Sequence, residues 1–146
     1  MKYLTSNIKE TKEIGSKEAR KIKKKKTALV FCLRGDLGAG KTAFLQGFGK
    51  GLGVKEKIQS PTFVIMSRFP LKKAEFNNFF HFDCYRLENP EEIINLGFKD
   101  IIINPENIVA IEWPEKIEKF LPKKRTEIIF KIINEDEREI IIKNIQ

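Results

Sequence analysis

Short apolar runs alternate along the chain with longer segments in which apolar residues recur at helical spacing. The short runs have the length and the β-branched and aromatic content of buried strands. These predicted strands cover residues 28–33, 63–69, 76–82, 108–111, 127–133 and 139–145. Polar segments at residues 70–75 and 134–138 each join two neighbouring runs, which predicts two hairpins.

Residues 7–26 are predicted to form an amphipathic helix. Asn7 has the side chain of a helix cap, and Glu10 follows at the spacing of a capping box. A modest apolar face runs through the segment. The lysines at residues 23–26 lie near its C-terminal end, where positive charge interacts favourably with the helix dipole.

Two further helices are predicted between the strands. The first covers residues 41–50, and Gly51 and Gly53 supply its stop signals. The second begins at the Asn-Pro pair of residues 89–90 and ends at Gly97. The alternation of strands and helices predicts an α/β fold, with a mixed central sheet that contains antiparallel hairpins and is flanked by helices.

A glycine-rich segment separates the first predicted strand from the next helix. Residues 35–42 read GDLGAGKT, which matches the phosphate-binding pattern G-x-x-x-x-G-K-[S/T] at every position. Glycine lets successive backbone N–H groups point into one concavity, and the following helix adds the positive end of its dipole. Lys41 can then reach the β- and γ-phosphates of a nucleotide, and the Thr42 hydroxyl can bind Mg²⁺. The segment therefore predicts a P-loop and a three-layer fold like that of P-loop NTPases.

An acidic residue ends each of two predicted strands. Asp83 follows the strand at residues 76–82, and Glu112 follows the strand at residues 108–111. Ligands of open α/β sheets bind beyond the carboxyl ends of the strands, so both acids are expected to face the P-loop. Such an acid holds the Mg²⁺ shell or positions the attacking water. From the residues alone, either acid can take either role.

Three more residues near the strand ends each have two interpretations. Thr62 follows Pro61 in a connecting loop, so it is either a nucleotide-sensing switch residue or a turn residue. Trp113, the single tryptophan, either contacts the nucleotide or anchors the core, and its residue type alone favours the core. His81 shares a strand face with Asp83 and, as a lone strand histidine, receives no role.

Length and composition predict one domain, residues 1–146. A hydrophobic content of 41% and a charged content of 33% are typical of soluble globular proteins. No apolar run approaches the roughly 20 residues of a membrane span, and the start of the chain lacks the apolar region of a signal peptide. Cys32 and Cys84 have no metal-binding or redox spacing. These features predict a cytoplasmic protein with no membrane partner.

The chain is basic, with a net charge of +8 and a pI of about 9.5. This balance is common in proteins that bind nucleic acids. However, lysine is abundant throughout the chain, and its clusters at residues 23–26, 72–73 and 123–125 are more often solvated surface than binding sites. Charge alone therefore does not predict contact with a nucleic acid.

Five segments together resemble the bacterial TsaE (YjeE) family. They are GDLGAGKT at residues 35–42, SPTF at 60–63, HFDCYRL at 81–87, PEEIINLGFKD at 90–100 and EWPE at 112–115. Their order and approximate spacing match the family over nearly the whole chain. The resemblance implies a small P-loop ATPase that helps to make N6-threonylcarbamoyladenosine at position 37 of tRNA. It also implies that the protein acts with the TsaB and TsaD proteins and reaches tRNA only through their complex.

The resemblance further implies roles for individual residues. Those implied to bind the nucleotide are Leu37, Gly38, Ala39, Gly40, Lys41, Thr42, Trp113 and Arg138. Mg²⁺ is implied to bind Thr42 and Glu112. For catalysis the family pattern implies Lys41, Asp83 as a Walker-B-like acid and Thr62 as a switch-like threonine. Basal ATP hydrolysis is expected to be slow and to be stimulated by the partners.

Two other functions use part of the same features. A small-molecule or nucleotide kinase shares the P-loop and the Mg²⁺-binding acids, but it usually has an arginine-bearing lid. The arginines here are few and scattered, and no stretch is long enough for such a lid. A basic nucleic-acid-binding module would need interleaved surface aromatics or a recognisable motif. An N-K-x-D guanine signature is absent from the sequence, which favours ATP over GTP.

Overall fold

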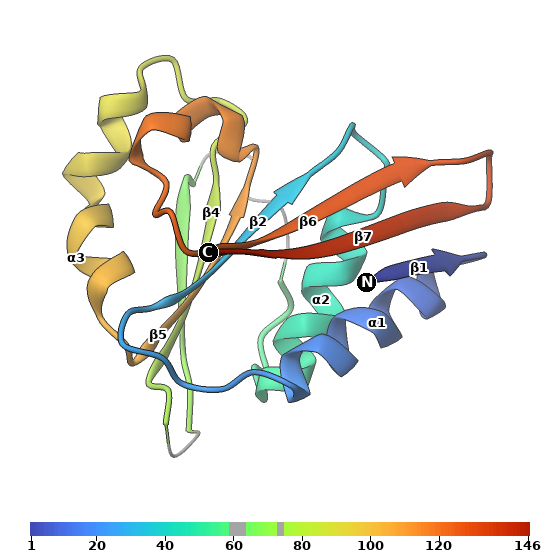
Figure 1. Cartoon of the computed structure of the whole chain (residues 1–146), viewed down its shortest axis with the longest axis horizontal. Helices are drawn as coiled ribbons and strands as arrows, with labels where there is room; N and C mark the ends of the chain where they lie inside the picture. The colour runs from blue at the N-terminus through green and yellow to red at the C-terminus, as the bar shows by residue number, and fades with distance from the viewer. Residues whose placement is uncertain (59–63, 73–74) are drawn as a thin grey trace.

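The computed structural model describes residues 1–58, 64–72 and 75–146. Within these residues, seven strands form one mixed sheet in the order β1-β7-β6-β2-β5-β4-β3. The strands are β1 (Lys2–Thr5), β2 (Leu29–Arg34), β3 (Met66–Pro70), β4 (Asn78–Asp83), β5 (Asn107–Glu112), β6 (Arg125–Ile132) and β7 (Arg138–Ile145). Helical segments lie on both faces of the sheet, so the predicted three-layer α/β fold is confirmed (Figure 1).

The two faces of the sheet are covered differently (Figure 1). One face carries the longer helices, α1 (Ile8–Arg20) and α2 (Lys41–Leu52). The other carries the 3-10 segment η1 (Pro90–Leu96), the short helix α3 (Phe98–Ile103) and the 3-10 segment η2 (Pro114–Phe120). Each layer of helices encloses its own hydrophobic core against the sheet.

Aromatic side chains join the sheet to the helices on both faces. The ring of Phe48 in α2 lies 5.0 Å from the ring of Phe31 in β2, measured between centroids. On the opposite face, the ring of Phe82 in β4 lies 5.3 Å from that of Phe98 in α3. Burying one such side chain contributes about 1.5–3 kcal/mol to the free energy of unfolding. Packing on both faces therefore fixes the central strands and the positions of their ends.

The four central strands run parallel and end at the same edge of the sheet. β5 pairs in parallel with β2 and with β4, and β2 pairs in parallel with β6. In this register, Glu112 lies opposite Leu33 on one side and Asp83 on the other. The antiparallel pairs β3–β4 and β6–β7 confirm the two predicted hairpins. The edge at which β2 leads into the P-loop therefore also carries both acids.

Helices α1 and α2 touch backbone to backbone. A Cβ atom at Gly15 in α1 would overlap the carbonyl group of Phe44 in α2. A Cβ atom at Gly47 in α2 would likewise overlap the carbonyl group of Lys12 in α1. Glycine at these positions allows the close approach, and the approach places the start of α1 beside the P-loop.

The N-terminal helix is shorter than predicted. Asn7 is its cap, as predicted, because its side chain accepts the backbone N–H of Glu10 at 2.9 Å. The Glu10 carboxylate accepts the N–H of Ser6 at 2.6 Å, so it bonds one residue before the cap. The helix ends at Arg20 because residues 19–26 contain closely spaced positive charges and no acid to offset them. The lysines at its predicted end lie instead in the connection to β2.

The sequence also predicted the wrong role for one glycine. Gly51 does not stop α2 but lies inside it, where a Cβ atom would come within 2.7 Å of the Ser16 carbonyl oxygen. Gly53 alone ends the helix, with a φ of 89°. Asn89 and Gly97 bound η1 as predicted, and α3 begins directly after Gly97. The elements β1, α3 and η2 were not predicted because they are too short to show a clear apolar period.

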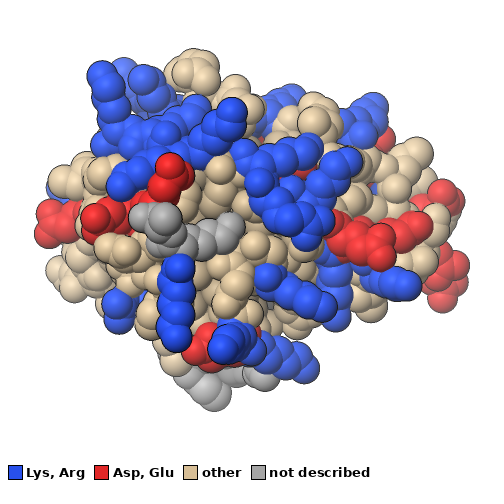
Figure 2. Space-filling model, turned by 90° about the horizontal axis from the view of Figure 1, so that it is seen from below, with Lys and Arg blue, Asp and Glu red and all other residues tan. Residues whose placement is uncertain are grey.

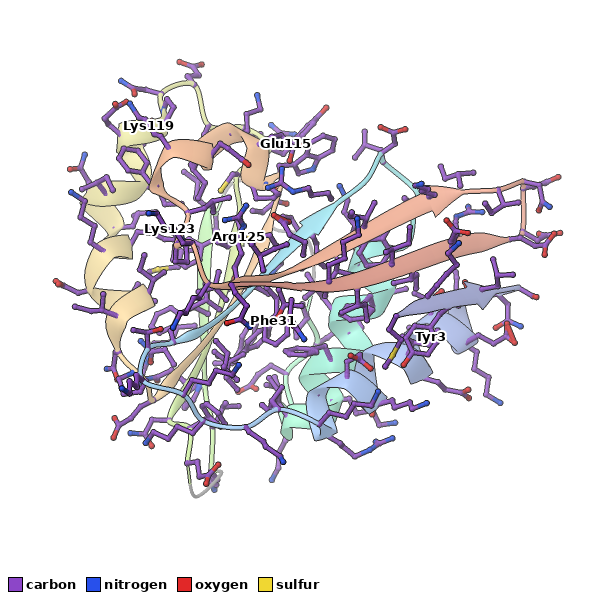
Figure 3. All side chains as sticks on the ribbon, viewed as in Figure 1. Tyr3, Phe31, Glu115, Lys119, Lys123 and Arg125 are labelled. Carbon is purple, nitrogen blue, oxygen red and sulfur yellow. The ribbon has the colours of Figure 1, made fainter. Side chains whose placement is uncertain are left out.

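Four charged side chains form a bonded group between β2, β6 and η2. We call it the Arg34 cluster; its members are Arg34, Glu118, Arg125 and Glu127. Arg34 donates from Nε to Glu127 at 2.8 Å and from Nη2 to Glu118 at 3.0 Å. Arg125, labelled in Figure 3, donates from Nε to Glu127 at 2.9 Å. The cluster therefore ties the end of β2 to η2, the segment that follows Trp113.

Basic side chains cover much of the face seen from below Figure 1 (Figure 2). The lysines at residues 23–26 are exposed. Among the large apolar side chains that are exposed in the described ranges, Tyr85 is the aromatic one, and its ring lies 4.9 Å from Trp113. A basic surface interleaved with aromatics is thus not seen in these ranges. No helix within them is long and apolar enough to cross a membrane.

Candidate functional site

The P-loop connects the end of β2 to the start of α2. Gly38 and Gly40 have φ values of 80° and 105°, in a region that favours glycine because it lacks a Cβ atom. Gly40 is the cap of α2 and makes no side-chain hydrogen bond to it. The first N–H groups of α2 are therefore not bonded by a capping side chain, as anion binding at a helix N-terminus requires.

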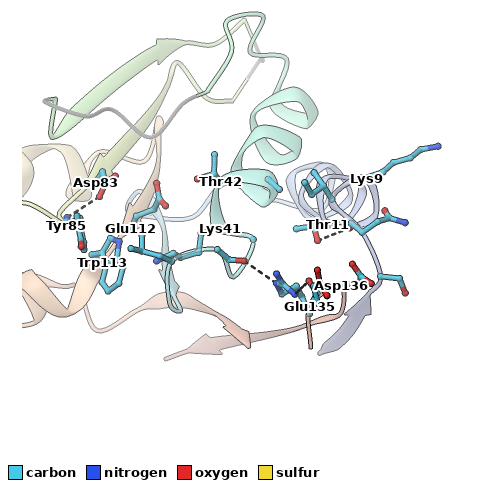
Figure 4. A pocket seen from close by; sticks show the side chains of 18 of the residues that line it. Lys9, Thr11, Lys41, Thr42, Asp83, Tyr85, Glu112, Trp113, Glu135 and Asp136 are labelled. Carbon is cyan, nitrogen blue, oxygen red and sulfur yellow. Dashed lines mark hydrogen bonds between the residues drawn. The ribbon is translucent and has the colours of Figure 1, made fainter. Parts of the chain in front are cut away.

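A cavity of about 1110 Å³ lies over the P-loop (Figure 4). Its walls come from the P-loop, the start of α1, the ends of β4 and β5, and the turn between β6 and β7. Sites for small molecules commonly enclose about 300–1,000 Å³, so this cavity has room for a nucleotide. In Figure 4, Asp83, Glu112 and Trp113 lie toward one end and Thr11, Glu135 and Asp136 toward the other, with Lys41 between them.

Lys41 is buried at the floor of this cavity. Its Nζ donates to the Gly35 carbonyl oxygen at 2.6 Å and lies 3.9 Å from the centroid of the Trp113 ring. Burial lowers the pKa of Lys41, and the charges of Glu112 and neighbouring acids oppose that effect. The surroundings of the ammonium group thus disfavour its positive charge. A bound anion would offset that unfavourable burial.

The two acids lie side by side because β4 and β5 pair in register. Asp83 accepts the backbone N–H of Tyr85 at 3.1 Å. Burial raises the pKa of Asp83, and the nearby charge of Glu112 raises it further, while the Tyr85 N–H lowers it. The Glu112 side chain is nearly fully buried, with 4% of its surface exposed. A buried and a half-buried carboxylate beside a P-loop suit a cation or the positioning of a water molecule.

Glu112 shares a hydrogen bond with His81, which the sequence left without a role. The Nε2 atom of His81 lies 2.7 Å from Oε2 of Glu112, and both side chains are buried. His81 is two residues before Asp83 on the same strand face, so it lies deeper in the sheet than the strand ends. Its partner could not be chosen from the sequence, because the bond depends on the pairing of β4 with β5.

Trp113 both lines the cavity and packs against the core on the far face of the sheet. Its φ of 56° and ψ of 49° are left-handed, a conformation that costs a non-glycine residue about 1–2 kcal/mol. Pro114 follows it and begins η2. The two interpretations of Trp113 are therefore not exclusive, since the strained backbone turns its ring toward Lys41.

Arg138 joins the turn between β6 and β7 to the P-loop. Its Nε donates to the Gly38 carbonyl oxygen at 3.2 Å. Its Nη1 donates to the carbonyl oxygens of Asn134 at 2.8 Å and Glu137 at 3.0 Å. This turn contains Glu135 and Asp136, which line the cavity. Arg138 thus closes one wall of the site.

Comparison with known proteins identifies the family. The model of the family described as threonylcarbamoyl adenosine biosynthesis protein TsaE matches residues 5–140. The chain belongs to the TsaE family. The tRNA threonylcarbamoyladenosine biosynthesis protein TsaE of Bacillus subtilis (strain 168) is 38% identical over 144 residues, which cover 96% of this chain and 83% of the relative. The protein of the same name from Rickettsia typhi is 38% identical over 142 residues, which cover 97% and 93%.

A solved structure supports the same assignment. The crystal structure of YdiB from Bacillus subtilis superposes with a TM-score of 0.75 at 32% sequence identity. The match covers 100% of this chain and 86% of that chain. The resemblance to the TsaE family and the P-loop fold that the sequence predicts are therefore confirmed.

The structure brings most of the predicted site residues of this TsaE protein to the cavity. Those lining it are Leu37, Gly38, Gly40, Lys41, Thr42, Asp83, Glu112, Trp113 and Arg138. Ala39 does not line it, because its methyl group is buried in the core and its N–H donates to the Asp36 carbonyl oxygen at 3.1 Å. Thr62 lies outside the described residues. The roles of all these residues remain predictions.

The start of α1 contributes site residues that could not be named from the sequence. Residues from Ser6 to Thr11 form one wall of the cavity. A signal was present in the glycines Gly15, Gly47 and Gly51, which allow α1 to approach α2. Because Gly51 also has the residue type of a helix stop signal, its part in this contact was not predicted.

The donor atoms at the acidic end of the cavity fit Mg²⁺. Thr42 offers a hydroxyl oxygen, and Asp83 and Glu112 offer carboxylate oxygens. Mg²⁺ prefers such oxygen ligands and usually takes only one or two from carboxylates, with phosphate and water completing its shell. In the described ranges no group of three or more His, Cys, Asp or Glu side chains forms a metal site. This set therefore fits an ion held jointly with a nucleotide.

Proposed function

We propose that this TsaE protein is a cytoplasmic, Mg²⁺-dependent ATP-binding and ATP-hydrolysing subunit. In this proposal it serves the formation of N6-threonylcarbamoyladenosine at position 37 of tRNA, together with the TsaB and TsaD proteins. One observation carries the biochemical part: the P-loop, Lys41 and the acids that end β4 and β5 all face one cavity. Membership of the TsaE family supports the pathway.

The triphosphate lies over the P-loop in this proposal. Backbone N–H groups between Leu37 and Thr42 bind the phosphates, and Lys41 exchanges the Gly35 carbonyl for phosphate oxygens. Thr42 and Glu112 hold Mg²⁺, which neutralises charge on the β- and γ-phosphates when bound. The anionic ligand thus offsets the cost of burying the Lys41 ammonium.

The acid Asp83 orients the attacking water. It stands at the end of β4 beside Glu112, and its carboxylate is already positioned by the Tyr85 N–H. A raised pKa suits a group that would accept a proton from water as that water bonds to the γ-phosphorus and ADP leaves. Thr62 is proposed to sense the γ-phosphate, on the strength of the SPTF segment alone.

The nucleoside occupies the other end of the cavity. The start of α1 and the turn at residues 134–137 lie there, and their polar side chains include Asn7, Thr11 and Asp136. These groups offer hydrogen-bond partners to a ribose and a base. Arg138 holds that turn against the P-loop and contributes to the nucleotide pocket.

A reconstitution experiment tests this function. ATP turnover is measured for the protein alone and with the TsaB–TsaD pair, while threonylcarbamoyladenosine is measured on tRNA in the same reaction. We expect slow turnover alone, faster turnover with the pair, and modified tRNA only when this protein and ATP are both present. Phosphoryl transfer to a small acceptor without any effect of the partners would instead establish the kinase alternative.

A further inference from the structure

His81 is the single histidine of the chain, and it lies in the middle of β4. Its neighbours in the sheet are Ser67 of β3 and Ala110 of β5. The imidazole is 1% exposed, and within the described ranges its hydrogen bond joins Nε2 to Oε2 of Glu112 at 2.7 Å. A buried imidazole thus contacts the carboxylate of Glu112, which lines the acidic end of the cavity.

The hydrogen bond determines which ring nitrogen carries the proton. A carboxylate accepts hydrogen bonds, so Nε2 of His81 is the donor. Nδ1 is buried without a hydrogen-bond partner in the described part of the chain. An unpartnered acceptor costs less than an unpartnered N–H, which favours this tautomer. The ring therefore offers one directed donor, and that donor serves Glu112.

Glu112 needs such a restraint because an opposite charge lies in the same cavity. Lys41 and Glu112 both line it, and the ammonium of Lys41 attracts the carboxylate. A direct ion pair between them would occupy the Lys41 ammonium, which is proposed to bind phosphate. It would also occupy a carboxylate oxygen of Glu112, which is proposed to bind the ion. The Nε2–H donor of His81 on the adjacent strand can hold the carboxylate in place.

We propose that His81 is a positioning residue that holds the Glu112 carboxylate in its Mg²⁺-binding orientation and keeps it from pairing with Lys41. This inference rests on the proposed function, because it assigns Glu112 to the ion. Partners of this kind behind a metal ligand commonly change metal affinity by about 10- to 100-fold when they are removed. The effect is expected only when the divalent ion is present.

Two amide substitutions separate positioning from packing. In His81→Gln the side-chain nitrogen can take the place of Nε2, whereas in His81→Asn it ends nearer the place of Nδ1 and falls short of Glu112. ATP affinity is measured by calorimetry for the wild type and both variants, with Mg²⁺ and with EDTA. We expect His81→Asn to lower the affinity about tenfold with Mg²⁺ and to leave the affinity in EDTA within about twofold. His81→Gln is expected to recover most of the loss.

The outcomes are distinguishable. An equal loss for both variants in both conditions, or no loss in either, would overturn the positioning role and leave the proposed function standing. A wild type whose ATP affinity does not depend on Mg²⁺ would overturn the proposed function, and the role of His81 with it. Thermal melting of each variant shows whether a loss reflects unfolding.

Nuclear magnetic resonance of the wild type tests the same inference without a substitution. Because the chain has one histidine, its imidazole signals need no assignment by mutation. We expect a proton on Nε2 that exchanges slowly with solvent. Adding Mg²⁺ to the ATP-bound protein should shift the imidazole signals more than adding ATP in EDTA does. A proton on Nδ1 instead, or signals that ignore Mg²⁺, would contradict the proposal.

Discussion

Two groups of charged side chains lie beside the central parallel strands, and their charges are stabilised in opposite ways. In the Arg34 cluster every charged member has an oppositely charged hydrogen-bond partner. In the second group, the Lys41 cluster, we include Lys41, Asp83 and Glu112. Among the described residues, Lys41 donates to the Gly35 carbonyl, Asp83 accepts the Tyr85 N–H, and Glu112 shares a hydrogen bond with His81.

The two clusters differ in whether burial or hydrogen bonding determines the direction of their pKa shifts. Burial alone would raise the pKa of Glu127 in the Arg34 cluster, but hydrogen bonds from Arg34 and Arg125 outweigh burial and lower it. In the Lys41 cluster, burial prevails, because it lowers the pKa of Lys41 and raises that of Asp83. The first cluster therefore stabilises its charges within the protein. In the proposed function, a ligand would stabilise the charges of the second.

Asp83→Asn should have the largest effect, and it should change activity and stability in opposite directions. The substitution removes the proposed water-orienting carboxylate, so partner-stimulated ATP turnover should fall about 100-fold or more. The raised pKa of Asp83 means that its ionised form is disfavoured in the folded state, so the melting temperature at pH 7 should rise. That gain should shrink as the pH falls through the folded-state pKa and vanish below 3.8, the ordinary value, where both side chains are neutral.

The matched control for this change is Asp100→Asn on the exposed side of α3. It should alter neither turnover nor the melting temperature. Calorimetric melting at pH 7 and pH 3.5, together with turnover assays, checks both variants. A fall in the melting temperature of Asp83→Asn at pH 7 would mean that Asp83 is a structural charge like Glu127.

Lys41→Ala should affect binding next most strongly. Loss of a charge-assisted bond to phosphate costs about 1.5–3 kcal/mol, which lowers ATP affinity about 10- to 100-fold. The fold should persist, because Lys41 bonds to a backbone carbonyl and pairs with no acid among the residues that the structure describes. Lys50→Ala, an exposed lysine at the other end of α2, is the control and should leave affinity unchanged. Calorimetric titration measures both; equal affinity in the wild type and Lys41→Ala would exclude the P-loop lysine from phosphate binding.

Much of the site was predictable because its signals are local. The glycines of the P-loop and Lys41 follow one another in the sequence, and Asp83 and Glu112 each end an apolar run. Parallel pairing brings such strand ends to one edge, so their convergence needs no knowledge of distant contacts. The cap at Asn89 and the hairpins are local in the same sense.

The rest depends on partners far apart in the chain. Arg34 and Glu127 are separated by 93 residues, and His81 and Glu112 by 31. Those pairs follow from strand order and register, which no short pattern encodes. The wall formed by α1 depends on a glycine contact between two helices, Gly15 against Phe44, which resembles an ordinary helix interior in the sequence.

Glu127→Gln should have the smallest effect on function and a moderate effect on the fold. Breaking the pairs with Arg34 and Arg125 should cost about 2 kcal/mol, or about 4–8 °C in melting temperature. The pKa of Glu127 is lowered, so its contribution is full above the ordinary value of 4.5 and is lost as the pH falls through the folded-state pKa. ATP affinity should not change.

The control for Glu127→Gln is Glu91→Gln, which removes an exposed pair between Glu91 and Lys119. Exposed pairs contribute little, so this variant should melt like the wild type. Melting curves from pH 3 to pH 8 check both. A deficit in Glu127→Gln that persists unchanged at pH 3 would show that packing, and not charge, explains its role.

The most direct test of the contrast between the two clusters is the increase in melting temperature that Mg²⁺–ATP produces. At a ligand concentration of 100 times Kd, binding should add about 2.7 kcal/mol to the free energy of unfolding, or about 5–10 °C. We expect this increase in the wild type. The same increase is expected in Glu127→Gln, although the melting temperature of that variant without ligand is lower. In Lys41→Ala at the same ligand concentration it should largely disappear. An increase that survives in Lys41→Ala, or is lost in Glu127→Gln, would contradict the division of charges between site and fold.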